Sequence, residues 1–261
     1  MRTIYGLLGL VVSGLLLTAQ SSKAQRTDSE EENYRTATTF GLTSNTNSGV
    51  IGGFAFRHTK LIPGTLFGMP QARYFSVELV NVKHPKELQS SINSVGSRFI
   101  EGKENYLFVI RPQYGREVRL FQRNSDEGVA VSGILAAGPS IGIIKPYYLE
   151  VSYANTTRTV PASQVNGFAT ATGETVTGSG GFFQGLDQSK FTVGLNLKAA
   201  LSFELSTFRS NTTGVEVGFL AKIFPNKVVI IPNTDPGGNR EDGNRSFFTS
   251  GYITLFFGSK K

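Results

Sequence analysis

The chain contains no cysteine, and this excludes several kinds of protein at once. Disulfide frameworks and thiolate metal sites are ruled out, as is anchoring through a lipid on a cysteine that follows an export signal. Charged residues make up only 17% of the chain, below the usual quarter. No segment after residue 24 approaches the roughly 18 consecutive apolar residues of a transmembrane helix. Strand-like alternation with intervening turn residues recurs there instead.

Residues 1–24 have the parts of a secretory signal peptide. Arg2 gives a positive start, residues 4–17 form an apolar run interrupted only by Gly and Ser, and small residues precede the expected cleavage site. The run is short for a membrane span, which favours a cleaved signal over an uncleaved anchor. We therefore predict a flexible N-terminal tail over residues 25–37 and a folded domain over residues 38–261.

The charge balance does not favour a nucleic-acid partner. Removing the signal peptide removes Arg2 and Lys23, so 26 basic residues become 24 against 19 acidic ones, a net charge of about +5. The basic residues are scattered and form no run, whereas nucleic-acid binding requires a basic patch. We expect no binding of nucleic acid.

The stretch KFTVGLNLKAALSFELS, residues 190–206, shows an alternation with a period of two. Every second residue from Phe191 to Leu205 is apolar, while the residues between are small or polar and include Lys198 and Glu204. Such a strand fits a soluble sandwich or a membrane barrel. Soluble strands usually run about 5–6 residues, whereas a tilted membrane-spanning strand needs about 9–11. The length favours the barrel.

Seven further segments show similar alternation, and the set predicts an all-β fold. The eight segments are 38–58, 73–82, 105–121, 128–143, 147–153, 190–206, 214–224 and 247–258. The middle of 38–58 is polar and rich in Gly, so this segment is either one long bent strand or two short ones. Eight is the smallest even number of strands for an outer-membrane barrel. We predict an eight-stranded antiparallel transmembrane up-and-down β-barrel, with Leu197 and Val217 facing lipid.

The links between these segments predict which end of the barrel faces outward. With a periplasmic N-terminus, the outward links are 59–72, 122–127, 154–190 and 225–246. The periplasmic links are 83–104, 144–146 and 206–213. Periplasmic turns are expected to be short, and 83–104 does not fit that expectation.

Charged residues recur on the face opposite the predicted lipid-facing side chains. They are Glu78, Arg111, Glu117, Arg119, Glu150, Lys198, Glu204, Glu216 and Lys222. The interior of an eight-stranded barrel is only wide enough for side chains, and buried charges must be paired. Five acids and four bases predict a mixed-sign charge network in the lumen. In a soluble sandwich the same charges would face water.

Several segments resemble the small outer-membrane β-barrel proteins of Bacteroidota. The resemblance rests on SKAQ at the end of the signal, VELVNVKHPKE, IRPQYGREVRLF, KPYYLEV, and KAALSFEL followed by GVEVGFLAKIFP. It covers nearly the whole mature chain and implies an outer-membrane barrel. It brings no catalytic residues. The chain departs from the usual terminal aromatic residue, because Gly-Ser-Lys-Lys follows Phe257.

The sequence offers little catalytic chemistry. His58 could act as the base of a lipid hydrolase with a serine nucleophile, but no Gly-x-Ser-x-Gly elbow occurs. Two lone histidines, His58 and His84, give no metal-site pattern, and no cofactor is expected. We interpret His58 as an ordinary strand-end residue.

The two longest predicted outward links suggest where a binding function lies. Long loops are uncommon unless they are functional or disordered, and 154–190 holds Phe168, Phe182 and Phe183 among small residues. We predict an outer-membrane protein with a structural, accessory or loop-binding role, in contact with membrane lipid. Either its outward loops bind a molecule outside the cell, or 83–104 docks an envelope protein. The alternatives are a narrow channel, a lipid-modifying enzyme using His58, and a soluble periplasmic β-sandwich.

Overall fold

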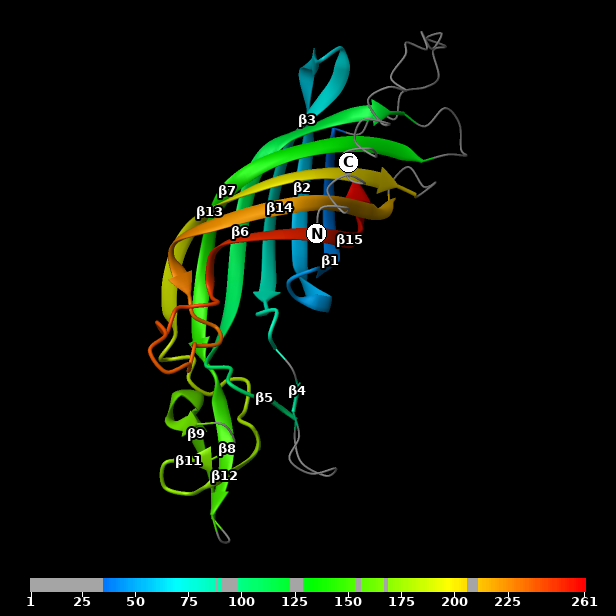
Figure 1. The fold of residues 1–261 in the computed structure, drawn as a ribbon. Coiled ribbons are helices and arrows are strands. Elements are labelled where there is room, and N and C mark those ends of the chain that lie inside the picture. Colours follow the sequence, from blue (N-terminus) through cyan, green and yellow to red (C-terminus); the bar gives the residue numbers. More distant parts are fainter. Residues whose placement is uncertain are drawn as a thin grey trace, which may run out of the picture. The chain divides into compact units, whose positions relative to one another are not determined.

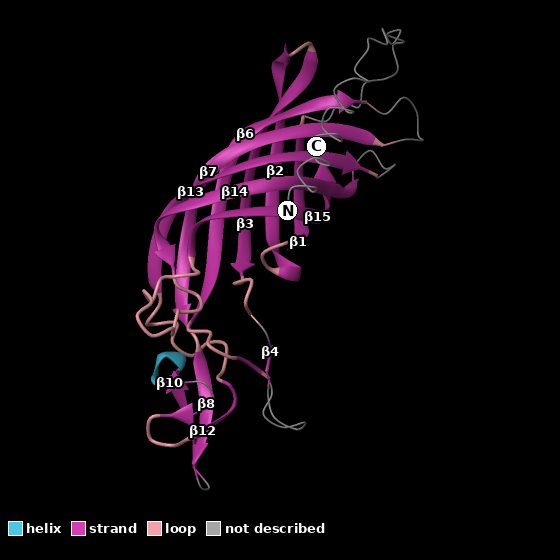
Figure 2. Ribbon diagram, in the orientation of Figure 1, coloured by secondary structure: helices cyan, strands magenta, loops and turns pink. Residues whose placement is uncertain are grey.

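The computed structural model describes residues 35–87, 89–90, 98–122, 129–153, 156–166, 169–205 and 211–261. The predicted signal peptide, almost all of the predicted tail and Phe168 lie outside these residues. The described chain is all-β and antiparallel, as predicted, apart from one turn of 3-10 helix, η1 (Ala162–Gln164) (Figure 2). That short turn is the sole helical element of the described residues, and it is far too short to cross a membrane.

Eight long strands form one sheet that closes on itself (Figure 1). They are β1 (Thr36–Asn45), β2 (Gly49–Leu66), β3 (Met69–Val82), β6 (Asn105–Phe121), β7 (Ala130–Pro146), β13 (Lys190–Glu204), β14 (Asn211–Val228) and β15 (Arg245–Lys260). Each strand pairs with the next long strand along the chain, and β1 also pairs with β15. The closing seam runs from Ala37, opposite Lys260, to Asn45, opposite Tyr252.

The eight strands of the barrel are not the eight predicted segments. Of the two possibilities for 38–58, two strands is the correct one: the segment is the hairpin of β1 and β2, whose turn lies at residues 46–48. Phe40 pairs with Phe56 across it, so even-numbered residues face the same way on both strands and imitate one long strand. The predicted strand 147–153 is not part of the barrel at all but belongs to a separate small sheet.

The recount changes which links share an end of the barrel. At the end that holds both described termini, the "termini end", lie the links from β2 to β3, from β6 to β7 and from β13 to β14. The opposite "loop end" carries the turn 46–48 and the links 83–104, 147–189 and 229–244. The assignment of 83–104 to the same end as 206–213 was therefore wrong, as was the grouping of 59–72 and 122–127 with the long links.

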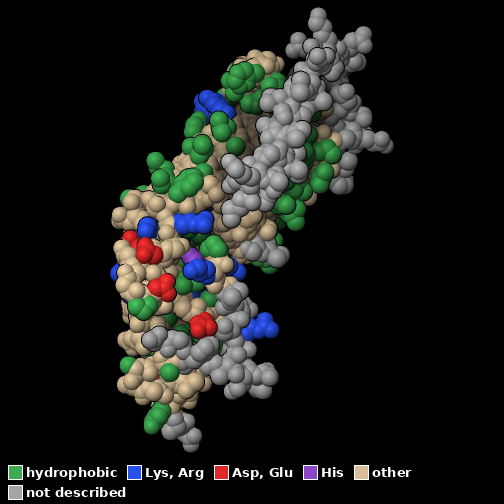
Figure 3. Space-filling model, viewed as in Figure 1, with side chains coloured by type: hydrophobic (Ala, Val, Ile, Leu, Met, Phe, Trp, Pro, Cys, Tyr) green, Lys and Arg blue, Asp and Glu red, His purple; other side chains and the backbone are tan. Residues whose placement is uncertain are grey.

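The barrel wall has one apolar and one polar face along most of its length. On β13 the odd-numbered side chains from Phe191 to Leu201 are exposed, while Asn196, Lys198 and Ser202 are buried. Leu197 is 54% exposed and Val217 on β14 is 42% exposed. Other large apolar side chains exposed on the outer wall include Phe40, Leu42, Phe54, Phe75, Leu79, Tyr114, Leu135, Phe219, Ile223, Ile253, Leu255 and Phe257. Figure 3 shows hydrophobic side chains over the wall, with charged side chains gathered toward the loop end.

The link between β7 and β13 folds into a small five-stranded sheet, which we call the module. Its strands are β8 (Tyr148–Tyr153), β9 (Thr156–Pro161), β10 (Val165–Asn166), β11 (Ala169–Thr170) and β12 (Thr175–Ser179), in the order β10-β11-β12-β8-β9. Its core contains Leu149, Val151, Val160 and Val176. Phe99 on β5 (Phe99–Ile100), which pairs with β4 (Gln89–Ser90), packs into the same core.

Candidate functional site: a packed barrel interior

A charge network crosses the middle of the barrel. The Nζ of Lys198 on β13, only 1% exposed, contacts Glu78 on β3 and lies 2.8 Å from Oε1 of Glu216 on β14. It also donates to the hydroxyl of Tyr74 at 3.2 Å. Arg111 pairs with the other oxygen of Glu78. Since β3 and β13 are not neighbours in the sheet, Lys198 and Glu78 must meet through the interior.

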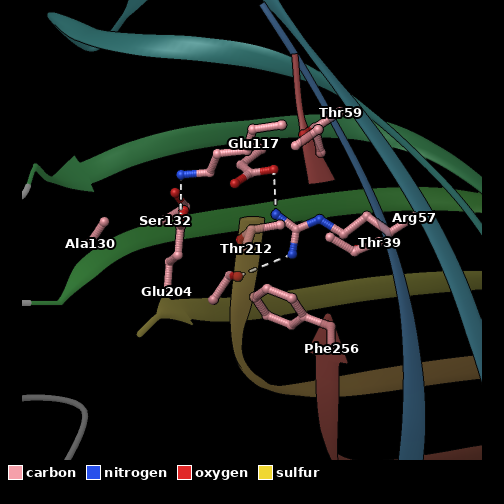
Figure 4. Close-up of a pocket in the computed structure, with 12 residues that line it drawn as sticks. Thr39, Arg57, Thr59, Glu117, Ala130, Ser132, Glu204, Thr212 and Phe256 are labelled. Atoms are coloured by element: carbon pink, nitrogen blue, oxygen red, sulfur yellow. Dashed lines mark hydrogen bonds and ion pairs between the residues drawn. The ribbon is translucent and has the colours of Figure 1, made fainter. Parts of the chain in front are cut away.

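Arg57 on β2 extends the network toward the termini end, and the sequence analysis missed it. Its guanidinium lies 2.7 Å from Glu117 on β6, 3.3 Å from Glu216, and 3.0 Å from the hydroxyl of Ser202. Figure 4 shows Arg57 between Glu117 and the ring of Phe256, whose centroid is 5.3 Å from the guanidinium carbon. Its position next to Phe56 was the signal that could have placed it inside, because neighbouring residues of a strand face opposite sides of the sheet.

Two tyrosines add hydrogen bonds to the network. The hydroxyl of Tyr252 on β15 donates to Glu216 at 2.6 Å, and Tyr74 is 1% exposed. Three acids (Glu78, Glu117, Glu216) face three bases (Arg57, Arg111, Lys198), so the central cluster is neutral. Buried charges are tolerated where they are paired and hydrogen-bonded.

The remaining predicted charges lie in different places. Glu204 pairs with Lys260, a residue the sequence analysis did not assign, at the termini end. Arg119 is half-buried on the inward side of β6. Lys222 is buried with its Nζ 5.2 Å from the ring centroid of Phe248, and the described residues offer it no carboxylate partner. The assignment of Glu150 to the lumen was wrong, because β8 lies outside the barrel.

Uncharged polar side chains lie among the charges, because Ser76 and Gln113 come between the Glu78–Arg111 pair and Glu117 along β3 and β6. Ser76 donates to Gln113 at 2.9 Å, and Gln113 donates to Asn196 at 2.7 Å. The amide of Asn196 donates in turn to the carbonyl of Pro139 at 2.8 Å. This chain of bonds ties β3, β6, β13 and β7 together across the interior.

Apolar side chains fill the loop end of the interior, where they form what we call the plug. It consists of Val80, Val82, Leu107, Val109, Phe224, Val228 and Ile230, with Ile144, Ile231 and Phe248 packed against them. Ile230 comes from the link 229–244, and its carbonyl accepts from the backbone N–H groups of Glu104 and Asn105 at 2.9 and 3.2 Å. The side chain of Asn244 accepts from the N–H of Ile230 at 2.9 Å. The link is thereby fixed across the mouth.

Two small cavities lie within the charge network, around Arg57 and Glu78. Their volumes are about 20 and about 10 Å³. A water molecule needs roughly 10–15 Å³ of such volume, so each of the two holds about one and is too small for a larger solute.

The predicted loop surface is partly packed onto the barrel. The ring of Phe182 lies edge-on to Phe108 on the outer wall, with centroids 5.8 Å apart, and edge-on to Phe183 at 5.3 Å. Lys145 lies beneath, its Nζ 5.7 Å from the Phe182 centroid. Phe183 itself is 78% exposed. These two aromatic residues thus lie beside the wall rather than on the module.

The module carries its own exposed ion pair. Arg158 on β9 contacts both carboxylate oxygens of Glu174. The hydrogen bond from Arg158, aided by the hydroxyls of Thr172 and Thr170, lowers the pKa of Glu174 to about 2. At the module's base, burial lowers the pKa of Lys103, which the nearby Glu87 carboxylate partly opposes.

The histidines have ordinary partners. His58 lies on the outward face of β2, toward the termini end, with its Nδ1 2.9 Å from the hydroxyl of Thr38. His84 contacts the backbone carbonyl of Gly243 at 3.0 Å. The described part of the chain shows no group of three or more residues placed to hold a metal ion. The described residues form a barrel whose interior is packed with side chains, and the module extends from its loop end.

Comparison with known proteins adds a likeness in fold. No protein-family model matches the chain, and neither does any curated protein sequence. Two solved structures of Ail, the attachment invasion locus protein of Yersinia pestis, are similar at 10% and 9% identity, with TM-scores of 0.35 and 0.36. Each comparison covers 87% of this chain and 97% of the other, and one of the two structures is a complex with the heparin analogue sucrose octasulfate. Likeness this distant carries no information about ligands, and kinship to Bacteroidota barrels stays a prediction.

Proposed function

We propose that this protein is an outer-membrane β-barrel that holds a folded module at the cell surface, with a binding or structural role rather than a catalytic one. The observation that carries the proposal is the pairing of an exposed apolar outer wall with buried charges inside a closed sheet. A soluble sandwich places its charges in water and its apolar face in the core. This chain has the opposite arrangement, which suits lipid.

The lengths of the links support the orientation. Outer-membrane barrels have short periplasmic turns and longer extracellular loops. The termini end has a two-residue turn at Phe67 and Gly68, both with positive φ, as two-residue hairpins prefer. The loop end carries the module and the mouth-covering link 229–244. We place the termini end in the periplasm, reached by export through the signal peptide at 1–24.

The filled interior supports an anchoring role over a channel. The plug fills the loop end of the lumen, and the charge network with its polar neighbours fills the part toward the termini end. Link 229–244 is hydrogen-bonded to residues 104 and 105 across the plug. A barrel built this way holds its loop end rigidly, and this suits the presentation of a binding surface by the module and by the exposed Phe183.

Excision of the module tests this role. The N–H of Gly180 donates to the carbonyl of Tyr148 at 2.8 Å, so residues 149–179 can be replaced by a short Gly-Ser bridge with both ends in place. Phe99→Ser in the same variant removes the most deeply buried of the apolar side chains that excision uncovers. We expect normal barrel assembly and loss of the binding or fitness phenotype of the intact chain.

A matched control is the Phe99→Ser single variant with the module present. Surface labelling of a cysteine placed at Tyr153, at the tip of β8, should succeed on intact cells, since the chain has no cysteine of its own. The proposal would be contradicted if the excised variant behaved like the wild type. It would also be contradicted if Tyr153→Cys reacted with the label only after the cells were broken.

A further inference from the structure

Three basic side chains lie in one row on the outer wall near the termini end. Lys60 on β2 is directly opposite Arg73 on β3, and Arg73 is directly opposite Arg116 on β6. All three are exposed, and each occupies one of the alternate positions whose side chains face outward on its strand. Directly opposed residues have Cβ atoms roughly 4.5–5.5 Å apart, so the row brings three positive charges within one small patch.

The patch is electrostatically unfavourable as it stands. Like charges directly opposite each other destabilise a sheet. Among the described residues, no carboxylate pairs with Lys60, Arg73 or Arg116, and their one acidic neighbour in sequence, Glu117, points inward to Arg57. Repulsion of this kind is relieved when an anion binds across the row.

The residues next to the row suggest which anion fits. Two positions further toward the loop end, His58, Phe75 and Tyr114 form a parallel row on the same three strands. Phe75 is 41% and Tyr114 57% exposed, and the exposed apolar wall continues beyond them through Leu79. A bound molecule would thus meet cations at one end and aromatic and aliphatic surface at the other.

We propose that Lys60, Arg73 and Arg116 form a binding site for the phosphate groups of an anionic phospholipid, whose acyl chains lie along Phe75, Tyr114 and Leu79. This inference rests on the proposed membrane barrel and adds a ligand class to its outer wall. The site lies at the termini end, so the lipid belongs to the periplasmic leaflet. Arginine is suited to phosphate because its planar fork donates two hydrogen bonds at once.

The test is lipid titration of the folded full-length chain in neutral detergent, followed by native mass spectrometry. The probes are phosphatidylglycerol, zwitterionic phosphatidylethanolamine, and inorganic phosphate alone. Each cation near a membrane surface contributes roughly a factor of 5 to binding, so Lys60→Ala/Arg73→Ala/Arg116→Ala should bind phosphatidylglycerol on the order of 100-fold more weakly. Added salt should weaken wild-type binding, because the row is exposed.

Two variants serve as controls. Lys83→Ala/Lys190→Ala/Arg245→Ala removes three exposed cations at the loop end, and it should leave phosphatidylglycerol binding unchanged. Lys60→Arg/Arg73→Lys/Arg116→Lys keeps all three charges but only one arginine, so it should bind phosphatidylglycerol more weakly than the wild type and more tightly than the alanine triple at the same positions. Equal losses in the two alanine triples would overturn the site, since net charge alone would then explain them.

The remaining outcomes separate this inference from the barrel proposal. Wild-type protein that inserts into membranes but binds phosphatidylglycerol and phosphatidylethanolamine equally would overturn the lipid site and leave the barrel standing. Inorganic phosphate bound as tightly as the lipid would overturn the phospholipid as the ligand. Failure of the wild-type chain to insert would overturn both proposals.

Discussion

Lys198→Met removes the central cation of the barrel interior and tests whether the charge network stabilises the fold. Methionine replaces the apolar stem of the lysine with a side chain of similar length. The variant leaves three carboxylates, Glu78, Glu117 and Glu216, with two arginines. One negative charge of this buried cluster then lacks compensation.

The structure sets the size of the loss. Breaking a buried ion pair by removing one partner costs about 3–5 kcal/mol. Glu78 keeps Arg111, while Glu216 keeps Arg57 at 3.3 Å and the Tyr252 hydroxyl at 2.6 Å. Because both acids retain a partner, we expect the lower end, about 3 kcal/mol. Lys198→Met/Glu216→Gln restores neutrality and leaves the pairs Glu78–Arg111 and Glu117–Arg57, so it should be more stable than Lys198→Met alone.

The assay is urea unfolding of the barrel in lipid vesicles, followed through the fraction of heat-modifiable protein on a gel. Lys190→Met is the matched control, since Lys190 is exposed at the start of the same strand and should change stability by less than about 0.5 kcal/mol. A loss below about 1 kcal/mol in Lys198→Met, or a double variant less stable than the single one, would refute the reasoning.

Three further measurements test other parts of the molecule. Leu197→Arg and Val217→Arg place a charge on the outer wall and should each cost about 2–4 kcal/mol near the bilayer midplane; full tolerance of both, with normal membrane yield, would argue against lipid contact. Planar-bilayer recordings of pure protein should show no steady single-channel conductance, because the plug and link 229–244 fill the mouth; reproducible steps would contradict this. By NMR, the carboxyl group of Glu174 should titrate near pH 2, and Arg158→Met should return its pKa toward 4.5. Any stabilisation from this ion pair is therefore complete above pH 4.5 and is lost as the pH falls through about 2. An unchanged pKa of Glu174 in the variant would refute the pairing.

The two faces of the wall could be predicted from the sequence because a period of two maps directly onto a strand. The alternation over 190–206 places Leu197 and Lys198 on opposite faces without any tertiary information. That Leu197 is the outward one depended on the length of the strand, which favoured a barrel. Strand boundaries were harder to predict. Even-numbered residues face the same side of the sheet before and after the turn at 46–48, as Phe40 and Phe56 do. The alternation therefore continues across the turn and gives no sign of it.

Long-range features lay beyond what a local pattern specifies. Leu149 and Val151 alternate like a barrel strand, but they face the module's own small core, and a sequence pattern does not say what an apolar face packs against. The pairing of Lys198 with Glu78 depends on the tilt and stagger of the closed barrel. Arg57 was missed because the prediction treated 38–58 as one segment, which hid the alternation of β2 on which Arg57 is an inward residue.

The gel mobility of membrane-extracted protein tests the central claim most directly, because it reports whether the sheet is closed and embedded in lipid. Outer membranes from cells producing the full chain are solubilised in dodecyl sulfate and loaded with or without boiling. A closed barrel held by the β1–β15 seam and the central charge network should resist unfolding at room temperature and migrate differently from the boiled chain. Identical migration of the two samples, with the protein recovered in the soluble periplasmic fraction, would contradict the membrane barrel.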